Sequence, residues 1–277
     1  MNTSPSIAHH AAPRAFGDYL RHWRQHRRLS QLDLAQEAEI STRHLSFVET
    51  GRSAPSREMV LRLAERLDIP LRERNALLVA AGYAPMYRER SLDDPALAPA
   101  RQAVELILKS HEPYPALAVD RHWNLVAANR MLPHLMEGAD ASLLQPPVNV
   151  LRLSLHPKGL APKIANLVQW RAHIFERLRQ QIHATGASQL AQLLDELRAL
   201  PVPEGCDETI EGELPGVLMP FRFRTGAGTL SFISTTTIFG TPVDVTLQEL
   251  ALETFFPADA ATAEALRALN SNHSLGN

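Results

Sequence analysis

Residues 29–52 have the pattern of two short helices joined by a tight turn, and this pattern limits the folds open to the chain. Ser30 is a favourable N-cap, and Asp33, three residues later, supplies the acidic partner of a capping box. Apolar residues then recur at helical spacing, and Ser41 can cap a second helix. The outward face of that second helix carries short polar groups and an arginine. The stretch therefore predicts a helix-turn-helix that enters a DNA major groove.

The motifs Ser-Gln-x-x-Leu-Ala, Ile-Ser and Leu-Ser-x-Val-Glu-x-Gly-Arg-x-x-Pro resemble the XRE (Cro/repressor-like) helix-turn-helix family over about residues 16–81. The resemblance implies that Gln31 contacts a phosphate and braces the recognition helix. Phe47 stands where a polar residue is commoner, which suggests contact with a thymine methyl group. The plain alternative is a small helical bundle that does not bind DNA. The residues expected to bind DNA are Gln31, Ser41, Thr42, Arg43, Ser46, Phe47 and Arg52.

Charge differs in sign between the two parts of the chain. Residues 1–90 contain 14 basic and 10 acidic side chains, a net charge of +4, whereas residues 91–277 contain 14 and 20, a net charge of −6. All basic residues of the first part are arginines, which bind phosphates bidentately and supply salt-dependent DNA affinity. Only the first part is therefore expected to lie on DNA. Because a single head binds modestly, a homodimer is expected.

The length of 277 residues is sufficient for two domains. Residues 1–15 lack periodicity and predict a disordered tail. Residues 16–83 predict a head of five helices. Residues 84–98 contain proline and mixed charge and predict a linker. Residues 99–270 predict the second domain.

The second domain is expected to contain two strands, a set of helices and then three strands. Its first strands would be residues 115–119 and 123–127, around a turn. The later alternating pattern predicts an antiparallel meander over residues 217–223, 230–239 and 243–256. This order predicts a PAS-like α/β fold, a five-stranded antiparallel sheet with helices covering one face. The expected helices are residues 100–110, a helix capped by Asn129 that continues through Leu135, and residues 148–155, 162–184, 188–200 and 260–269.

Three segments resemble the MmyB-like transcription regulators: Tyr-Pro-Ala-Leu-Ala-Val-Asp-Arg-His-Trp-Asn-Leu-Val-Ala-Ala-Asn, Val-Asn-Val-Leu-Arg-Leu-Ser-Leu-His-Pro and Leu-Glu-Thr-Phe-Phe-Pro-Ala-Asp. The resemblance covers roughly residues 16–259. It implies an XRE head coupled to a PAS-like domain that encloses a long apolar ligand of the fatty-acid type. The expected function is a dimeric, sequence-specific regulator that senses such a ligand. The alternative is a regulator whose C-terminal domain only dimerises or binds a protein partner.

A ligand cavity in such a fold would lie between the sheet and the helices, with apolar walls and a few polar anchors. His156 and Arg171 are the expected anchors for a carboxylate, and Phe255 is a further wall candidate. Arg222 and Arg224 alternate with two inward phenylalanines and would point away. The same apolar residues could fill an ordinary core, and the sequence does not separate these alternatives. The expected ligand-binding residues are Trp123, Leu151, Leu155, His156, Leu167, Trp170, Arg171, Phe221, Phe223 and Phe232.

No catalytic or metal motif stands out in the sequence. It contains no Gly-rich phosphate loop, no Gly-x-Ser-x-Gly elbow and no Cys-x-x-Cys pair. The single cysteine, Cys206, excludes an internal disulfide and lies in an acidic loop that disfavours a reactive thiolate. No apolar run reaches the ~20 residues of a membrane span. We therefore expect a cytoplasmic protein that is not an enzyme and holds no metal and no cofactor other than a bound lipid effector.

Overall fold

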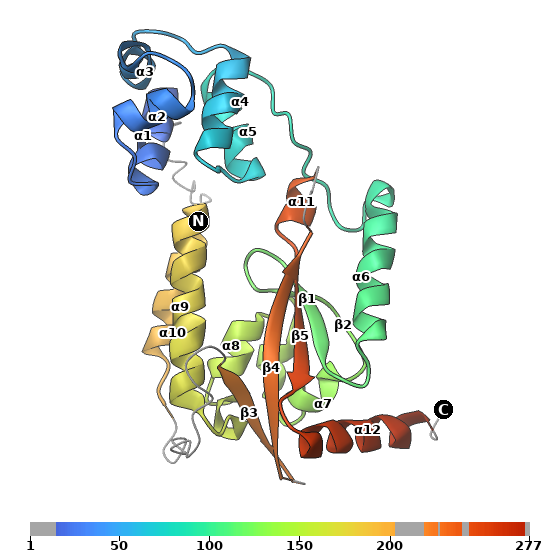
Figure 1. Ribbon diagram of the computed structural model, residues 1–277. Coiled ribbons are helices and arrows are strands. Elements are labelled where there is room, and N and C mark those ends of the chain that lie inside the picture. Colours follow the sequence, from blue (N-terminus) through green and yellow to red (C-terminus); the bar gives the residue numbers. More distant parts are fainter. Residues whose placement is uncertain (1–14, 203–218, 227, 240–243, 275–277) are drawn as a thin grey trace, which may run out of the picture. The chain divides into compact units, whose positions relative to one another are not determined.

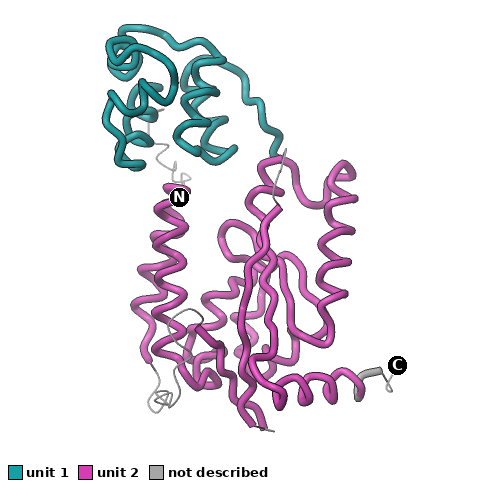
Figure 2. The backbone as a smooth tube through the Cα atoms, viewed as in Figure 1, with its two compact units in different colours: residues 1–89 teal, residues 90–277 magenta. Residues whose placement is uncertain are grey.

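The computed structural model divides the chain into two compact units, residues 1–89 and residues 90–277, which Figure 2 shows in different colours. The structure describes residues 15–202, 219–226, 228–239 and 244–274. Residues 1–14 of the expected tail, Cys206 and the first residues of the strand expected at 217–223 lie outside these ranges. Among the described residues, no helix is long and apolar enough to cross a membrane.

From residue 15 onward, the first unit consists of five helices, as the sequence predicts. Ser30, Ser41 and Ser56 cap three of them, each accepting a hydrogen bond from the backbone N–H three residues on. The Asp33 side chain accepts a bond from the Ser30 backbone, which completes the expected capping box. Caps of this kind contribute about 1 kcal/mol each. The helices are α1 (Phe16–His26), α2 (Gln31–Glu37), α3 (Thr42–Glu49), α4 (Arg57–Arg66) and α5 (Leu71–Ala80).

Apolar side chains at helical spacing form the core of this unit. Leu20 and Trp23 of α1, Leu34 of α2 and Leu45 of α3 belong to one buried cluster. Burying a side chain of this kind stabilises the fold by roughly 1.5–3 kcal/mol. The inner side of α3 is therefore fixed by packing, which leaves its other side to solvent.

The first residues of the expected linker pack against α5. The Asn75 side chain accepts hydrogen bonds from the backbone N–H groups of Met86 and Tyr87 (3.0 Å each) and donates one to the Tyr87 carbonyl (2.7 Å). Arg72, on the same helix, pairs with Glu89. This segment is therefore tied to the first unit by hydrogen bonds and an ion pair.

The second unit is built on a five-stranded sheet in the order β2-β1-β5-β4-β3, with every neighbouring pair antiparallel. The expected pair of short strands and the later meander are both present and meet where β1 pairs with β5. The last strand is shorter than the expected 243–256, because Asp244 caps a short helix by accepting a hydrogen bond from Thr246. The elements are β1 (Ala116–Val119), β2 (Leu125–Ala128), β3 (Pro220–Thr225), β4 (Gly228–Ile238), α11 (Val245–Gln248) and β5 (Ala251–Pro257).

Helices lie on both faces of this sheet, which corrects the expectation that they cover one face. Leu117 and Val119 of β1 belong to the large core that contains α8, α9 and α10, whereas Ala116 and Ala118 pack with Val104 of α6. In Figure 1, α6 and the α9–α10 pair flank the sheet on opposite sides. Amphipathic spacing predicts that a helix has a buried side, but not which face of the sheet it meets. The other α-helices of this unit are α6 (Ala98–Ser110), α7 (Leu132–Met136), α8 (Val150–Leu155), α9 (Leu167–Thr185), α10 (Ser188–Ala199) and α12 (Ala260–Ser274), and the 3-10 helices are η1 (Pro95–Leu97), η2 (Ala141–Leu144) and η3 (Ala161–Lys163).

Candidate DNA-recognition helix and ligand cavity

The outer side of α3 carries most of the side chains that the sequence predicts to bind DNA. Ser41 and Arg43 are exposed, and Thr42, Ser46 and Phe47 are partly exposed. The opposite side of the helix is buried in the core of the first unit. A helix fixed along one side and free along the other has the geometry required for insertion into a major groove.

Two guanidinium groups approach the ring of Phe47. The Cζ atoms of Arg43 and Arg52 lie 5.3 Å and 5.9 Å from the ring centroid. An exposed cation at this distance is attracted to the ring by roughly 0.5–1 kcal/mol. The backbone N–H of Arg52 also donates to the Phe47 carbonyl at 2.8 Å. Phe47 therefore orders two positive charges beside α3 while its ring remains partly exposed.

A buried carboxylate at the end of α3 connects this helix to α1 and α2. Glu49 accepts two hydrogen bonds from Arg24 (2.6 and 3.0 Å) and one from the Gln31 side chain (2.8 Å). Burial by itself raises the pKa of the Glu49 carboxyl, but the bonds from Arg24 and Gln31 and the arginine charges outweigh burial and lower the pKa. The same hydrogen bonds from Arg24 favour the charged form of the arginine and so raise the pKa of Arg24. Gln31 thus braces α3 from inside the unit, and its contact with a phosphate stays a prediction.

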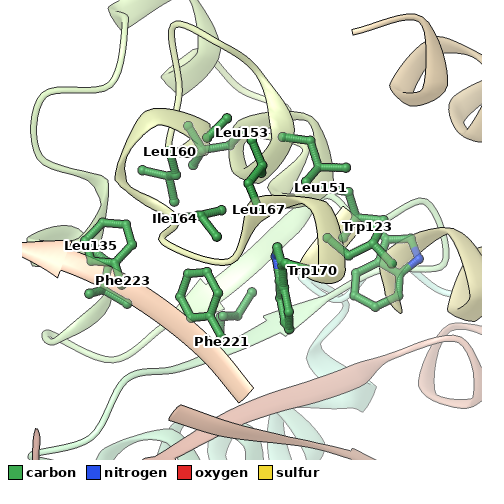
Figure 3. Packing of buried hydrophobic residues seen from close by; sticks show 14 of the residues in the cluster. Trp123, Leu135, Leu151, Leu153, Leu160, Ile164, Leu167, Trp170, Phe221 and Phe223 are labelled. Carbon is green, nitrogen blue, oxygen red and sulfur yellow. The ribbon is translucent and has the colours of Figure 1, made fainter. Parts of the chain in front are cut away.

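An apolar cavity of about 90 Å³ lies between the sheet and helices α7, α8 and α9. Figure 3 shows Trp170 and Phe221 side by side in this core, with ring centroids 4.8 Å apart. The Trp170 indole N–H donates to the Ser154 hydroxyl at 3.1 Å, which fixes the ring. The volume is below the ~150 Å³ of an engineered apolar cavity that binds benzene. The lining residues are Leu117, Trp123, Leu132, Leu135, Met136, Val150, Leu151, Leu153, Ser154, Leu160, Trp170, Ile174, Arg177, Phe221, Glu253 and Phe255.

The apolar residues predicted to bind a ligand divide into two groups. Trp123, Leu151, Trp170 and Phe221 line the cavity, and so does the further wall candidate Phe255. The others belong to the same buried cluster but are not in contact with the cavity. Both groups are apolar and buried, so the residue types alone could not distinguish a wall position from a filled core position. The second group consists of Leu155, Leu167, Phe223 and Phe232.

The two predicted anchors, His156 and Arg171, do not line the cavity. His156 follows α8, and its Nδ1 accepts a hydrogen bond from the Lys158 backbone at 3.0 Å. Arg171 is 8% exposed, and one of its guanidinium nitrogens makes long contacts with the carbonyls of Leu197 and Arg198. Burial lowers the pKa of Arg171. In this arrangement neither side chain reaches a ligand inside the cavity.

The polar wall of the cavity is an ion pair that sequence reasoning missed. Arg177 of α9 donates to both carboxylate oxygens of Glu253 on β5 (3.0 and 2.6 Å) and to the Thr236 hydroxyl (2.5 Å). The Arg177 guanidinium also lies 4.6 Å from the centroid of the Trp123 ring. The two partners are 76 positions apart in the chain, so no local spacing reveals the pair. The available signal is an acidic residue that alternates with Ala251 and Phe255 on the core-facing side of its strand.

His22 and His26 lie four residues apart on α1, a spacing that can serve a metal site. Their rings stack with centroids 5.9 Å apart, and both make edge contacts with the Trp23 ring. In the described part of the chain, no three His, Cys, Asp or Glu side chains are grouped to hold a metal ion. The histidine pair is therefore part of the packing around Trp23.

Two family models match the chain. One is described as the MmyB-like transcription regulator ligand binding domain and matches residues 100–269, and the other is described as a helix-turn-helix domain and matches residues 15–77. A comparison with curated proteins finds no significant match. Among solved structures, one described as "Structure of an RNA-binding Light-Oxygen-Voltage Receptor" is 14% identical with a TM-score of 0.25, and the match covers 94% of this chain and 65% of that chain. A score this low supports no argument about fold or function.

Proposed function

We propose, because the chain belongs to the MmyB-like transcription regulators, that a ligand bound in its second unit controls DNA binding by its first. The chain is a DNA-binding transcription regulator with a helix-turn-helix domain followed by a ligand-binding domain. The observation that carries the proposal is the apolar cavity, whose lining falls inside the region matched by the ligand-binding family. Side chains around an empty space lack contacts on one side, so a ligand that fills the space gains them.

We propose that α3 reads DNA bases and that the residues around it bind the backbone. Arg43 and Phe47 would meet base edges, an assignment supported by their exposure and their mutual contact. Arg52, held beside Phe47, is suited to a phosphate or a base at the end of the helix. Ser41, Thr42, Ser46 and Gln31 would complete the surface.

The proposed ligand is a small apolar molecule of the fatty-acid type. The apolar lining and the family membership support this choice. A ligand larger than the present space requires a wall to move, and Met136 on the short helix α7 is the most adaptable lining residue. Binding would therefore reposition α7 relative to the sheet.

The proposed mechanism requires a homodimer. Two heads on one face of DNA must lie about 34 Å apart to meet successive major grooves. A ligand that changes how two C-terminal units pair would change this spacing, and a small rotation would then weaken DNA binding. The protein would act as a ligand-dependent switch of operator affinity.

The test is native mass spectrometry of the purified full chain, followed by denaturing analysis of the same sample. We expect a dimer with additional mass that is released as a small apolar molecule. Thermal unfolding with and without medium-chain fatty acids provides a second test, since a ligand of the folded state raises stability by mass action. A monomer would contradict the spacing mechanism, and no thermal shift with any apolar ligand would contradict the sensor.

The small volume of the cavity favours one other candidate function. In it, the second unit has an essentially filled core and serves only dimerisation or contact with a protein partner. This alternative predicts a dimer without additional mass and a melting temperature that apolar ligands do not change.

A further inference from the structure

We propose that the connection between the two units is anchored along its length, and that its attachment to α11 carries the ligand signal from the cavity to the DNA-binding unit. The inference rests on the proposed sensor function and names the structural element through which that function acts. The sequence predicts a linker over residues 84–98. A flexible segment of this length has an end-to-end distance of roughly 20 Å, which would absorb a small rotation instead of transmitting it.

The first part of this segment is fixed to the first unit. The Arg72 guanidinium donates to both carboxylate oxygens of Glu89, at 2.7 and 2.5 Å. The Asn75 side chain bonds the backbone of Met86 and Tyr87. The chain therefore follows α5 as far as Glu89.

From Arg90 onward the chain is fixed to the second unit. The Thr246 hydroxyl on α11 donates to the Arg90 carbonyl at 2.6 Å. The Arg90 guanidinium lies 3.5 Å from the carboxylate of Asp244, whose side chain is 1% exposed. Leu92 packs against the apolar cluster that contains Leu252 of β5. This part of the expected linker is therefore attached to α11 and to the sheet.

No flexible spacer is left between the two anchored parts. Glu89 is held by the first unit and Arg90 by the second, and the two are neighbours in the chain. Their Cα atoms are therefore about 3.8 Å apart, the length of one peptide step. A displacement of Arg90 is passed on to the first unit, because no slack chain can absorb it.

The element that holds Arg90 leads directly into the wall of the cavity. α11 is followed by β5, whose residues Glu253 and Phe255 line the cavity. Val245 of α11 and Leu250, just before β5, are 0% and 2% exposed, so packing fixes the segment between them. β5 is paired with β1 on one side and β4 on the other. A ligand that separates the helices from the sheet acts on β5 and, through it, on α11.

Limited trypsin digestion of the full-length protein tests the anchor without any ligand. Trypsin cuts after Arg88 and Arg90, and the masses of the products identify the bond that was cut. In Thr246→Val, which keeps the side-chain shape and removes the hydroxyl donor, we expect cleavage at these bonds to be about fivefold faster, the change typical of one lost hydrogen bond. Thr237→Val, at an exposed position of β4, is the matched control and should be cut like the wild type.

The second measurement tests whether the anchor carries the signal. Fluorescence anisotropy gives the affinity for a DNA fragment that the wild-type protein selects from random sequences, with and without sodium decanoate. In Thr246→Val we expect a DNA affinity within about twofold of the wild type without decanoate and a clearly smaller change when decanoate is added. Decanoate should raise the melting temperature of both proteins equally, because Thr246 does not line the cavity.

The outcomes separate this inference from the function on which it rests. Equal cleavage of the wild type and Thr246→Val would show that the hydroxyl does not anchor Arg90, and faster cleavage with an unchanged decanoate response would show that the signal takes another route. Either result overturns the inference and leaves the sensor standing. If decanoate changes neither the melting temperature nor the DNA affinity of the wild type, the sensor is contradicted and the inference fails with it. If Thr246→Val does not fold, Asp244→Asn replaces it, since the amide keeps an acceptor for the Thr246 backbone and removes the charge beside Arg90.

Discussion

Replacing Glu49 with glutamine tests whether a buried ion pair positions the recognition helix. Glu49 is 3% exposed, and its main partner, Arg24, is 9% exposed. The substitution keeps one carbonyl acceptor for Arg24 or Gln31 but removes the negative charge. Arg24 would then be left as a buried cation whose other hydrogen bond goes to the Leu29 carbonyl.

The expected loss of stability is at the lower end of the range for breaking a buried pair. Removing one partner of such a pair costs about 3–5 kcal/mol. The remaining amide acceptor argues for about 3 kcal/mol, which corresponds to a little over a hundredfold in the opening equilibrium. The ion pair between Arg21 and Glu49 adds little to this loss of stability, because the two groups lie 3.7 Å apart and 41% of the Arg21 side chain is exposed.

Hydrogen exchange followed by mass spectrometry on the full chain is the appropriate assay, because it resolves peptides of α1, α2 and α3 from those of the second unit. We expect faster exchange in these three helices in Glu49→Gln and unchanged exchange in the sheet. Glu65→Gln, at an exposed position on α4, is the control. A difference between the two variants below about 1 kcal/mol would refute the argument that the pair positions α3.

The pH dependence of the folding stability gives an independent test of the contribution of Glu49. The folded-state pKa of Glu49 is lowered below its ordinary value of 4.5. Its contribution is therefore fully present above that value and is lost as pH falls through the lower folded-state pKa. The difference in stability between wild type and Glu49→Gln should accordingly shrink in acid and stay constant above pH 5.

Three further substitutions test other parts of the structure. Arg43→Ala should cost about 1–3 kcal/mol of operator affinity and relax specificity at one base pair in a binding assay against variant operators, whereas an equal loss on all DNA would make Arg43 a phosphate contact. Gly17→Ala should destabilise the first unit by about 1–3 kcal/mol in the same exchange assay, because the added methyl would lie 2.2 Å from the Glu49 carbonyl oxygen. Burial, together with the nearby Arg177, lowers the pKa of His173 in the folded protein below the ordinary value of 6.5. As the pH drops below that value, His173 is therefore protonated more readily in the unfolded chain than in the folded protein, and the stability of the wild type falls. Denaturant titrations should show this fall in the wild type and a smaller one in His173→Gln, and equal slopes would contradict the assignment.

The fold could be predicted where a local pattern determines the local structure. Ser30 and Ser41 cap the helices that the motif predicts, and the alternation of Phe221 and Phe223 predicts a strand with both rings inward. The strand expected over 243–256 failed in part because Asp244 caps a helix, a signal that competes with the β-forming residues after it. The second face of the sheet was missed because helical spacing in α6 does not identify the surface that the helix covers.

The candidate sites could be predicted to different degrees for a related reason. Most of the proposed recognition surface lies on one short helix, so spacing within a single motif places its side chains on one face. The cavity lies between the sheet and several helices, and its polar wall joins Arg177 to Glu253 across 76 positions. His156 and Arg171 are expected anchors because a ligand carboxylate needs a cation, but chain position alone does not show that neither residue lines the cavity.

Each unit contains a bidentate arginine–carboxylate pair that joins a helix of its candidate site to a neighbouring element, and the surroundings of the two pairs differ. The Arg24–Glu49 pair is enclosed by protein atoms and a third partner, Gln31, so it acts on the position of α3 alone. The Arg177–Glu253 pair lines the cavity, so its charged groups also face any molecule that enters it. Neutralising the glutamate should therefore change stability and DNA binding in the first unit, but the affinity for a ligand of the cavity in the second. Similar effects of Glu49→Gln and Glu253→Gln on ligand affinity would contradict this distinction.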